Sequence, residues 1–369
     1  MMRRKETSQL IRIIAKSLIL LLVINYGFIF LEKLPFTDFS IYNTFFTGRE
    51  RLPFGETPTD SYSLTMNNID AMLASHRING NPGEDNFRIA VIGDSSIWGF
   101  LQENNNTLVG ILNNKYANQC FDKKIQFFNL GYPSLSILKD LLIINGIQKY
   151  EPDLIIWFIT LESLPEKEQL SSPLVLNNPL LINEVIDKYD LDFEKNRINQ
   201  LDFTLIKRKR ELADIWRLQL YGIPWSATGI DQVIPESYSP AQRDFERDEE
   251  YKNIPIGELS ESDLALDVIR QAEQAIKTDL VIINEPILIS NGSNSDIRYN
   301  FYYPRWAYDS YREIAKKYMI ENELKYYDLW NTVPESEFTN SAIHLSIEGQ
   351  KILAKRVNDI INEYCTNPR

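Results

Sequence analysis

Short, almost uninterrupted apolar runs alternate with segments of helical spacing along most of this chain. The predicted strands are residues 88–92, 124–129, 153–159, 279–283 and 325–329. The predicted helices are residues 108–116, 137–148, 306–318 and 347–364. Strands without a polar side are typical of a parallel sheet that helices cover on both faces. The pattern therefore predicts an α/β domain with a doubly covered parallel sheet.

The N-terminal part of the chain carries a long apolar run beside basic residues. Residues 17–31 contain no charged side chain, and adding 13–16 brings the run to the roughly 20 residues that span a bilayer. Five basic residues precede the apolar run: Arg3, Arg4, Lys5, Arg12 and Lys16. The positive-inside rule then predicts a cytoplasmic tail at 1–12, a transmembrane anchor at 13–31 and an extracytoplasmic remainder. A cleaved signal peptide is the alternative, although no small-x-small cleavage site follows the run.

Two segments interrupt the alternation and define the expected domain organisation. The sequence of residues 32–86 predicts an irregular extracytoplasmic stalk. Residues 162–278 separate the third and fourth strands by far more than an ordinary connection, which predicts an inserted cap subdomain of mainly helical structure. The sheet domain is then expected to comprise residues 87–161 and 279–369.

The predicted insert has an unusual distribution of charge and aromatic residues. A basic patch at 207–210 precedes an amphipathic stretch that contains Trp216, Tyr221 and Trp225. Packing of these aromatic side chains onto the sheet domain is the preferred interpretation. A lid that touches the lipid interface, where Trp and Tyr are favoured, is the alternative.

Charge and composition exclude several classes of function. The chain has 369 residues, with 39 Lys and Arg against 51 Asp and Glu, so its formal net charge is −12. This charge argues against nucleic acid as a partner, because phosphate binding needs fields of Lys and Arg. With 2 Cys and 2 His, a zinc site built from Cys and His clusters is not expected.

A candidate nucleophile follows the first predicted strand. Residues 93–99 read Gly-Asp-Ser-Ser-Ile-Trp-Gly, and Ser95 lies in the turn where the strand ends and a helix begins. Sites in open α/β sheets gather at the carboxyl ends of the strands. After the second strand, Gly131 permits a close backbone approach and offers a further N–H donor.

A nucleophilic serine needs a base, and histidine is scarce in this chain. His76 precedes the predicted sheet, whereas His344 lies between the last strand and the last helix. That loop is also on the carboxyl edge of a doubly wound sheet, so Ser95 and His344 can meet there. The pair indicates nucleophilic acyl chemistry.

These motifs resemble the SGNH/GDSL hydrolase superfamily. The resemblance covers residues 87–160 and 279–364, from Gly-Asp-Ser-Ser-Ile-Trp-Gly through Asn-Leu-Gly-Tyr-Pro to Ile-His-Leu-Ser-Ile-Glu-Gly. It implies a three-layer α/β/α, flavodoxin-like parallel sheet of order 2-1-3-4-5 and no metal or organic cofactor. It also implies that Ser95 is the nucleophile, that His344 is the general base, and that the N–H groups of Ser95 and Gly131 form an oxyanion hole.

Two positions depart from the family pattern. Glu162 occupies the position of the Asn that donates to the oxyanion in the third family block, and an ionised carboxylate has no proton to donate. Asn177, Asn178 and Asn284 are candidate substitutes. Ser341 stands where an Asp normally precedes the His by three residues, and Asn340 lies one position further back. His344 is then expected to be oriented by Glu162 or Glu285, or to act in a dyad.

The resemblance also makes a prediction about the two cysteines. Cys120 follows the first helix of the sheet domain, and Cys365 closes the last helix. In the strand order of the family these helices pack side by side and end at the same edge of the sheet. A Cys120–Cys365 disulfide is therefore expected, which agrees with a translocated domain.

The leading functional hypothesis is a membrane-anchored serine esterase or O-acyltransferase that acts on acyl or acetyl esters of a cell-envelope glycan. Its expected partners are an acylated carbohydrate or other ester and, for transfer, a membrane protein that donates the acyl group. The runner-up is a catalytically inactive glycan-binding or polysaccharide-assembly component with the same fold. A lipid esterase is a third hypothesis, and it requires the insert to act as an interfacial lid.

Overall fold

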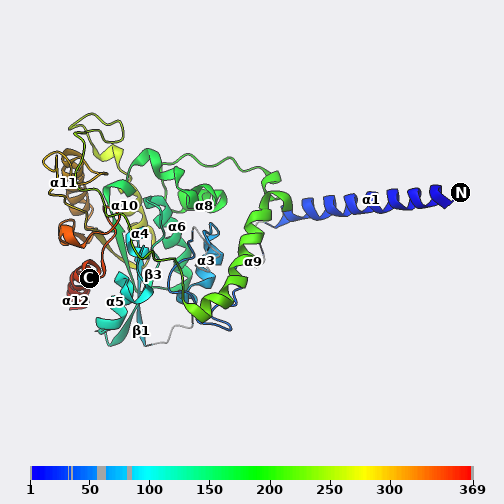
Figure 1. Ribbon diagram of the computed structural model, residues 1–369, viewed down its shortest axis with the longest axis horizontal. Coiled ribbons are helices and arrows are strands. Elements are labelled where there is room, and N and C mark those ends of the chain that lie inside the picture. The colour runs from blue at the N-terminus through cyan, green and yellow to red at the C-terminus, as the bar shows by residue number, and fades with distance from the viewer. Residues whose placement is uncertain (1, 32, 35, 56–63, 81–84, 367–369) are drawn as a thin grey trace.

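The computed structural model describes residues 2–31, 33–34, 36–55, 64–80 and 85–366 (Figure 1). The N-terminal run forms helix α1 (Met2–Gly27) and a 3-10 turn, η1 (Phe28–Phe30), and α1 extends away from the rest of the molecule. Within the described residues, one helix has the length and apolarity to cross a membrane, and 6% of its apolar window is buried. This length and composition suit a membrane anchor or a signal sequence equally.

The body of the protein is built on one mixed sheet. In the described part of the chain it has six strands in the order β2-β3-β1-β4-β5-β6. The strands are β1 (Asn86–Ile92), β2 (Gln119–Cys120), β3 (Lys123–Asn129), β4 (Leu154–Ile159), β5 (Asp279–Asn284) and β6 (Tyr326–Asp328). β2 pairs antiparallel with β3, and the remaining pairs are parallel. The five parallel strands confirm the predicted order 2-1-3-4-5.

Helices cover both faces of the sheet. Alternate side chains of β1 divide between two hydrophobic cores: Ile89 and Val91 lie in one, Ala90 and Ile92 in the other. The first core contains α5 (Leu108–Lys115) and α12 (Ile347–Thr366). The second contains α6 (Ile137–Ile147), α10 (Leu266–Ala275) and α11 (Arg305–Glu321). The continuous apolar runs thus form strands of which both faces are buried by helices.

The disulfide between Cys120 and Cys365 is present, with a Cα–Cα distance of 5.2 Å. It joins the end of β2 to the last turn of α12, beside the contact between α12 and α5. The prediction made from the strand order of the family is therefore confirmed.

Replacing both cysteines by serine is expected to lower the free energy of unfolding by about 2–5 kcal/mol. The bond closes a loop with a sequence separation of 245 residues, and opening it returns conformational freedom to the unfolded chain. Denaturant unfolding of the parent and the double variant measures the difference. Both proteins are also unfolded in the presence of reductant, which should destabilise the parent alone. Equal midpoints for the parent and the variant, with and without reductant, would contradict a stabilising role of the disulfide.

The segment predicted as a stalk is instead packed into the second core, which corrects that expectation. Tyr42, Leu52 and Met66 are buried, and α3 (Ile69–Ser75) lies against α6. Apart from a helix-like segment at 67–75, where α3 lies, the apolar residues here follow neither a helical nor a strand period, so the pattern could not indicate burial. Residues 56–63 and 81–84 of the expected stalk lie outside the described part of the chain.

The insert contains the helices α7 (Pro173–Leu176), α8 (Pro179–Lys188) and α9 (Leu205–Thr228), whereas residues 229–260 after α9 are irregular. Helices α7 and α8 contact α6, so this part extends the helical layer of the sheet domain. The expected boundary at residue 278 is too late, because α10 packs on α6 as the crossover helix before β5. Trp225 is buried as the preferred interpretation required, whereas Trp216 is exposed.

Candidate active site

Ser95 opens the short helix α4 (Ser95–Trp98), directly after β1. Asp94 caps this helix, because its Oδ1 accepts a hydrogen bond from the Ser96 N–H at 2.7 Å. The helix ends at Gly99, whose φ of 87° lies in the left-handed region that glycine adopts readily. The side chain of Ser95 is partly exposed at the carboxyl edge of the sheet, as expected for a residue that meets a substrate.

Ser95 and His344 are brought together across 249 residues of sequence. Ser95 Oγ lies 2.8 Å from His344 Nε2. His344 belongs to the loop between β6 and α12, which is closed by an antiparallel bridge between Phe338 and Leu345. The Thr339 N–H donates to the His344 carbonyl at 2.9 Å and tightens this loop. The geometry is that of a serine with a base in hydrogen-bond reach.

The partner of His344 on its other ring nitrogen is Asn340, which corrects the expectation of a glutamate. Nδ1 lies 2.9 Å from the Asn340 Oδ1, an atom that can only accept. The proton is therefore assigned to Nδ1, and the lone pair of Nε2 faces the Ser95 hydroxyl. Glu162 is paired with Lys252, and Glu285 accepts from the Ser96 hydroxyl, so both expected partners are used elsewhere. Asn340 precedes His344 by four residues in the same loop.

Burial lowers the pKa of His344 to about 4, and the negative charge of Asp94 offsets only part of this effect. The imidazole ring stacks on Phe100 with 5.0 Å between ring centroids. Asn340 fixes the tautomer but brings no charge that would favour the imidazolium. The base is consequently neutral, and ready to accept a proton, at every pH well above 4.

Activity is expected to be flat through neutral pH and to fall as the pH drops through about 4, where His344 takes up a proton. Asn340→Asp should move this acid limb upward by about one to three pH units, because a carboxylate beside the ring favours its charged form. The pH profile of kcat/KM for both proteins measures the limb. Asn118→Asp, at an exposed position before β3, is the control and should leave the profile unchanged. An unmoved limb in Asn340→Asp would contradict the assignment of Asn340.

Gly131 lies against the nucleophile helix, where a larger residue would not fit. A Cβ at this position would lie 2.4 Å from the Trp98 backbone nitrogen. Its N–H donates to the Asn129 Oδ1 at 3.2 Å, and the Asn129 amide donates to the Ile97 carbonyl at 2.9 Å. Asn129 thus ties the end of β3 to α4 and holds the Gly131 N–H beside the serine turn.

Glu162 offers no donor to an oxyanion. Its carboxylate forms an ion pair with Lys252, which also binds Glu168 at 2.9 Å. Lys252 comes from the insert, and the sequence carried no signal for this pairing. The three candidate substitutes are engaged elsewhere: Asn177 donates to Pro173, Asn178 to Asn67 and Leu174, and Asn284 to Asp328. None of these three Asn side chains therefore supplies the oxyanion donor that the third family block normally provides.

A buried cluster of charged groups lies below the serine turn. The Lys139 ammonium donates to the Gly93 carbonyl at 2.9 Å and to the Tyr132 carbonyl at 3.1 Å, and it forms an ion pair with Asp140. Lys139 thus fastens the loops that carry Ser95 and Gly131 to α6. Burial, together with the nearby charge of Asp94, raises the pKa of Glu285 well above its ordinary value. Glu285 accepts a hydrogen bond from the Ser96 hydroxyl and so supports the serine turn through Ser96.

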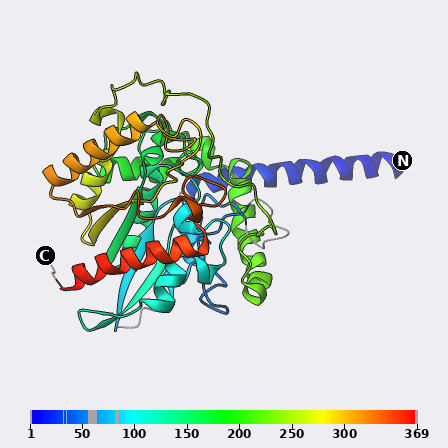
Figure 2. The ribbon, with the colours of Figure 1, turned by 60° about the vertical axis from the view of Figure 1, so that its left-hand side comes forward.

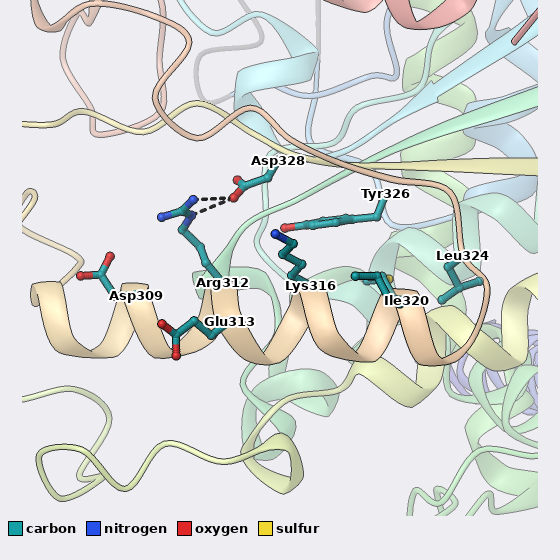
Figure 3. Close-up of a pocket in the computed structure, with 9 residues that line it drawn as sticks. Asp309, Arg312, Glu313, Lys316, Ile320, Leu324, Tyr326 and Asp328 are labelled. Atoms are coloured by element: carbon teal, nitrogen blue, oxygen red, sulfur yellow. Dashed lines mark hydrogen bonds and ion pairs between the residues drawn. The ribbon is translucent and has the colours of Figure 1, made fainter. Parts of the chain in front are cut away.

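A groove of about 570 Å³ lies apart from these residues, along α11 and β6 (Figure 3). Charged side chains dominate its lining, and Arg312 binds Asp328 at 2.7 Å across it. Ser95 and His344 are not among the residues that line this groove. The candidate active site is therefore located by the contact between these two side chains and not by the groove.

No protein-family model matches the sequence, and no match was found among curated proteins. Similar solved structures include a carbohydrate acetylesterase family member from Sinorhizobium meliloti, 8% identical, with a TM-score of 0.34 over 76% of this chain and 99% of that chain. A member of the lipolytic G-D-S-L family from Veillonella parvula DSM 2008 is 11% identical, with a TM-score of 0.35 over 74% of this chain and 98% of that one. At these identities and TM-scores the likenesses carry no functional argument.

Proposed function

We propose that this chain is a membrane-anchored serine esterase or O-acyltransferase of the SGNH/GDSL type, acting on acyl or acetyl esters of a cell-envelope carbohydrate. The observation that carries the proposal is the 2.8 Å contact between Ser95 Oγ and His344 Nε2, with Asn340 behind the imidazole. A serine hydroxyl is a poor nucleophile at neutral pH, and an adjacent base is what activates it.

The reaction begins when Ser95 Oγ attacks the ester carbonyl carbon and its proton passes to His344 Nε2. Asn340 Oδ1 accepts a hydrogen bond from the His344 Nδ1–H throughout and keeps the ring oriented. The tetrahedral intermediate collapses when the C–O bond to the alcohol breaks, and His344 returns the proton to that alcohol. Water or a sugar hydroxyl then attacks the acyl-enzyme by the same steps, and Ser95 regains its proton.

The developing oxyanion is held by the backbone N–H groups of Ser95 and Gly131. In the resting arrangement the Gly131 N–H is turned toward Asn129 at 3.2 Å, a long bond that a charged oxyanion can displace. With Glu162 in place of the third donor, the site has less oxyanion stabilisation than a site with three donors. Losing one such donor typically lowers turnover by ~10²–10³, so a slow enzyme is expected.

Helix α1 holds this domain at the membrane, with the N-terminus in the cytoplasm and the catalytic domain on the other side. Two features support the orientation: the five basic residues before the apolar run and the disulfide, a bond that persists in oxidising compartments. The proposed substrate class, an ester-bearing carbohydrate of the cell envelope, follows from this location and from the resemblance to the SGNH/GDSL superfamily. Transfer would require a second membrane protein to deliver the acyl group.

The test is treatment of the purified full chain in detergent with a fluorophosphonate, followed by intact mass. One covalent adduct is expected, since these probes react with activated serines. Acetylated sugars are then screened for released acetate, and adding free sugar acceptors separates hydrolysis from transfer.

The absence of an adduct and of acetate release would reject the enzyme. It would favour a glycan-binding or assembly component, the function that the Glu162 substitution supports. Binding of acylated oligosaccharides by the full chain, measured by calorimetry, would then be the next observation.

A further inference from the structure

The helix α9 of the insert is apolar on two opposite sides. Its inner side, with Ile215, Leu218 and Trp225, is buried against the body of the protein. On the opposite side, Ile206, Trp216, Leu220 and Ile223 are between 53% and 66% exposed. These four follow a helical period, so they form one stripe along the outside of α9.

Two further aromatic side chains extend this stripe. Phe36 and Phe39 are 50% and 51% exposed, and the ring of Phe36 lies 6.2 Å from that of Trp216. Their segment is fixed along α9 because the Ile41 N–H donates to Gln219 at 2.8 Å. We call the exposed set the outer α9 face: Ile206, Trp216, Leu220, Ile223, Phe36 and Phe39. A continuous apolar face of this kind marks an interaction site.

The outer α9 face lies next to the apolar helix α1. The Ile206 N–H donates to the Asn25 side chain at 2.9 Å, and Arg208 donates to the Leu31 carbonyl at 2.6 Å, so the start of α9 is attached to the end of α1. In both views α9 is on the side of the body that faces α1, and it runs across the axis of α1 instead of continuing it (Figures 1 and 2). A bilayer that holds α1 would therefore lie beside α9, nearest to the end that is attached to α1.

The charge distribution on this helix favours the same neighbour. The chain has a net charge of −12, yet residues 207–210 are Lys-Arg-Lys-Arg at the end of α9 that is attached to α1. Lys207 and Lys209 are exposed. Basic residues beside exposed Trp, Leu and Ile are typical of a helix that lies in a membrane interface with anionic lipids.

We propose that the outer α9 face rests on the bilayer that holds α1, with its apolar side chains about 5–10 Å into the boundary between headgroups and acyl chains. Lys209, which lies on the same side of α9, then reaches the phosphates of anionic lipids. The inference rests on the membrane anchoring proposed above and adds a second attachment. Two attachments fix the orientation of the domain, so that Ser95 is presented at a constant position relative to the membrane surface.

Single cysteines test the proposal in the full chain, because both native cysteines are held in the disulfide. Leu220→Cys, Ile320→Cys on α11 and Leu20→Cys within α1 are labelled with an environment-sensitive fluorophore. The proteins are reconstituted in phosphatidylcholine–phosphatidylglycerol vesicles with and without nitroxide-labelled lipids. Leu220 and Ile320 are matched, at 66% and 67% exposed.

The label at 220 should be quenched by shallow nitroxide lipids and be several-fold less accessible to aqueous iodide than the label at 320. The label at 20 should be quenched by deep nitroxides. Quenching at 20 together with iodide-accessible labels at both 220 and 320 would overturn the inference while preserving the anchor. A label at 220 shielded from iodide yet insensitive to nitroxide lipids would indicate a second protein copy and also overturn it. Iodide access at 20 would reject the anchor itself.

Discussion

Ser95→Ala is expected to lower kcat by roughly 10⁴–10⁶-fold, the range found when the nucleophile of a serine–histidine site is removed. His344→Ala should cost a similar factor, and the double variant little more, because the two residues act as one unit. In the structure they are joined by the 2.8 Å contact on which the whole proposal rests. Acetate release from an acetylated sugar, together with fluorophosphonate labelling, measures the loss.

The neighbouring serine provides the matched control. The Ser96 hydroxyl points away from His344 and donates to Glu285, so Ser96→Ala should still take up one probe molecule. An adduct that persists in Ser95→Ala would show that another residue is the nucleophile. Full activity in His344→Ala would reject the base and with it the proposed mechanism.

Asp231→Ala is expected to lower the free energy of unfolding by about 3–5 kcal/mol, because it leaves two buried cations without the carboxylate between them. Asp231 lies within 2.5 Å of Arg49 and 3.2 Å of Arg51, and all three side chains are buried. Trp225 and Asn104 donate to the same carboxylate at 2.8 and 3.1 Å. Burial alone would raise the pKa of Asp231, but the two guanidinium groups hold it below its ordinary value.

Asp231→Ala should affect the active site as well as the stability of the fold. Arg51 also donates to the carbonyls of Gly99 and Gln102 at 3.1 and 3.0 Å, just after the helix that carries Ser95. Denaturant unfolding in detergent measures the loss of stability. Asp187→Ala is the control, since its pair with Lys195 is exposed and should contribute less than ~1 kcal/mol. Equal unfolding midpoints for both variants would contradict the role of the cluster.

The burial of the segment at 32–86 depends on this cluster, which local sequence does not indicate. Arg49, Arg51 and Asp231 look like surface residues in the sequence, and about 180 residues separate the arginines from their partner. Charged side chains are buried only when they are paired. The pairing exists only once the insert and the N-terminal segment have packed around the serine loop.

The sequence by itself indicated the doubly covered sheet, because its strands read as continuous apolar runs, and it predicted that Ser95 and His344 meet at the carboxyl edge. The strand order and the disulfide followed from the resemblance to the SGNH/GDSL superfamily. Only the tertiary structure decided that Asn340 orients His344 and that Lys252 pairs with Glu162. Each of these depends on the direction of side chains in loops and on partners far apart in sequence. Such contacts are fixed by the closure of the fold, and no periodicity in the chain records them.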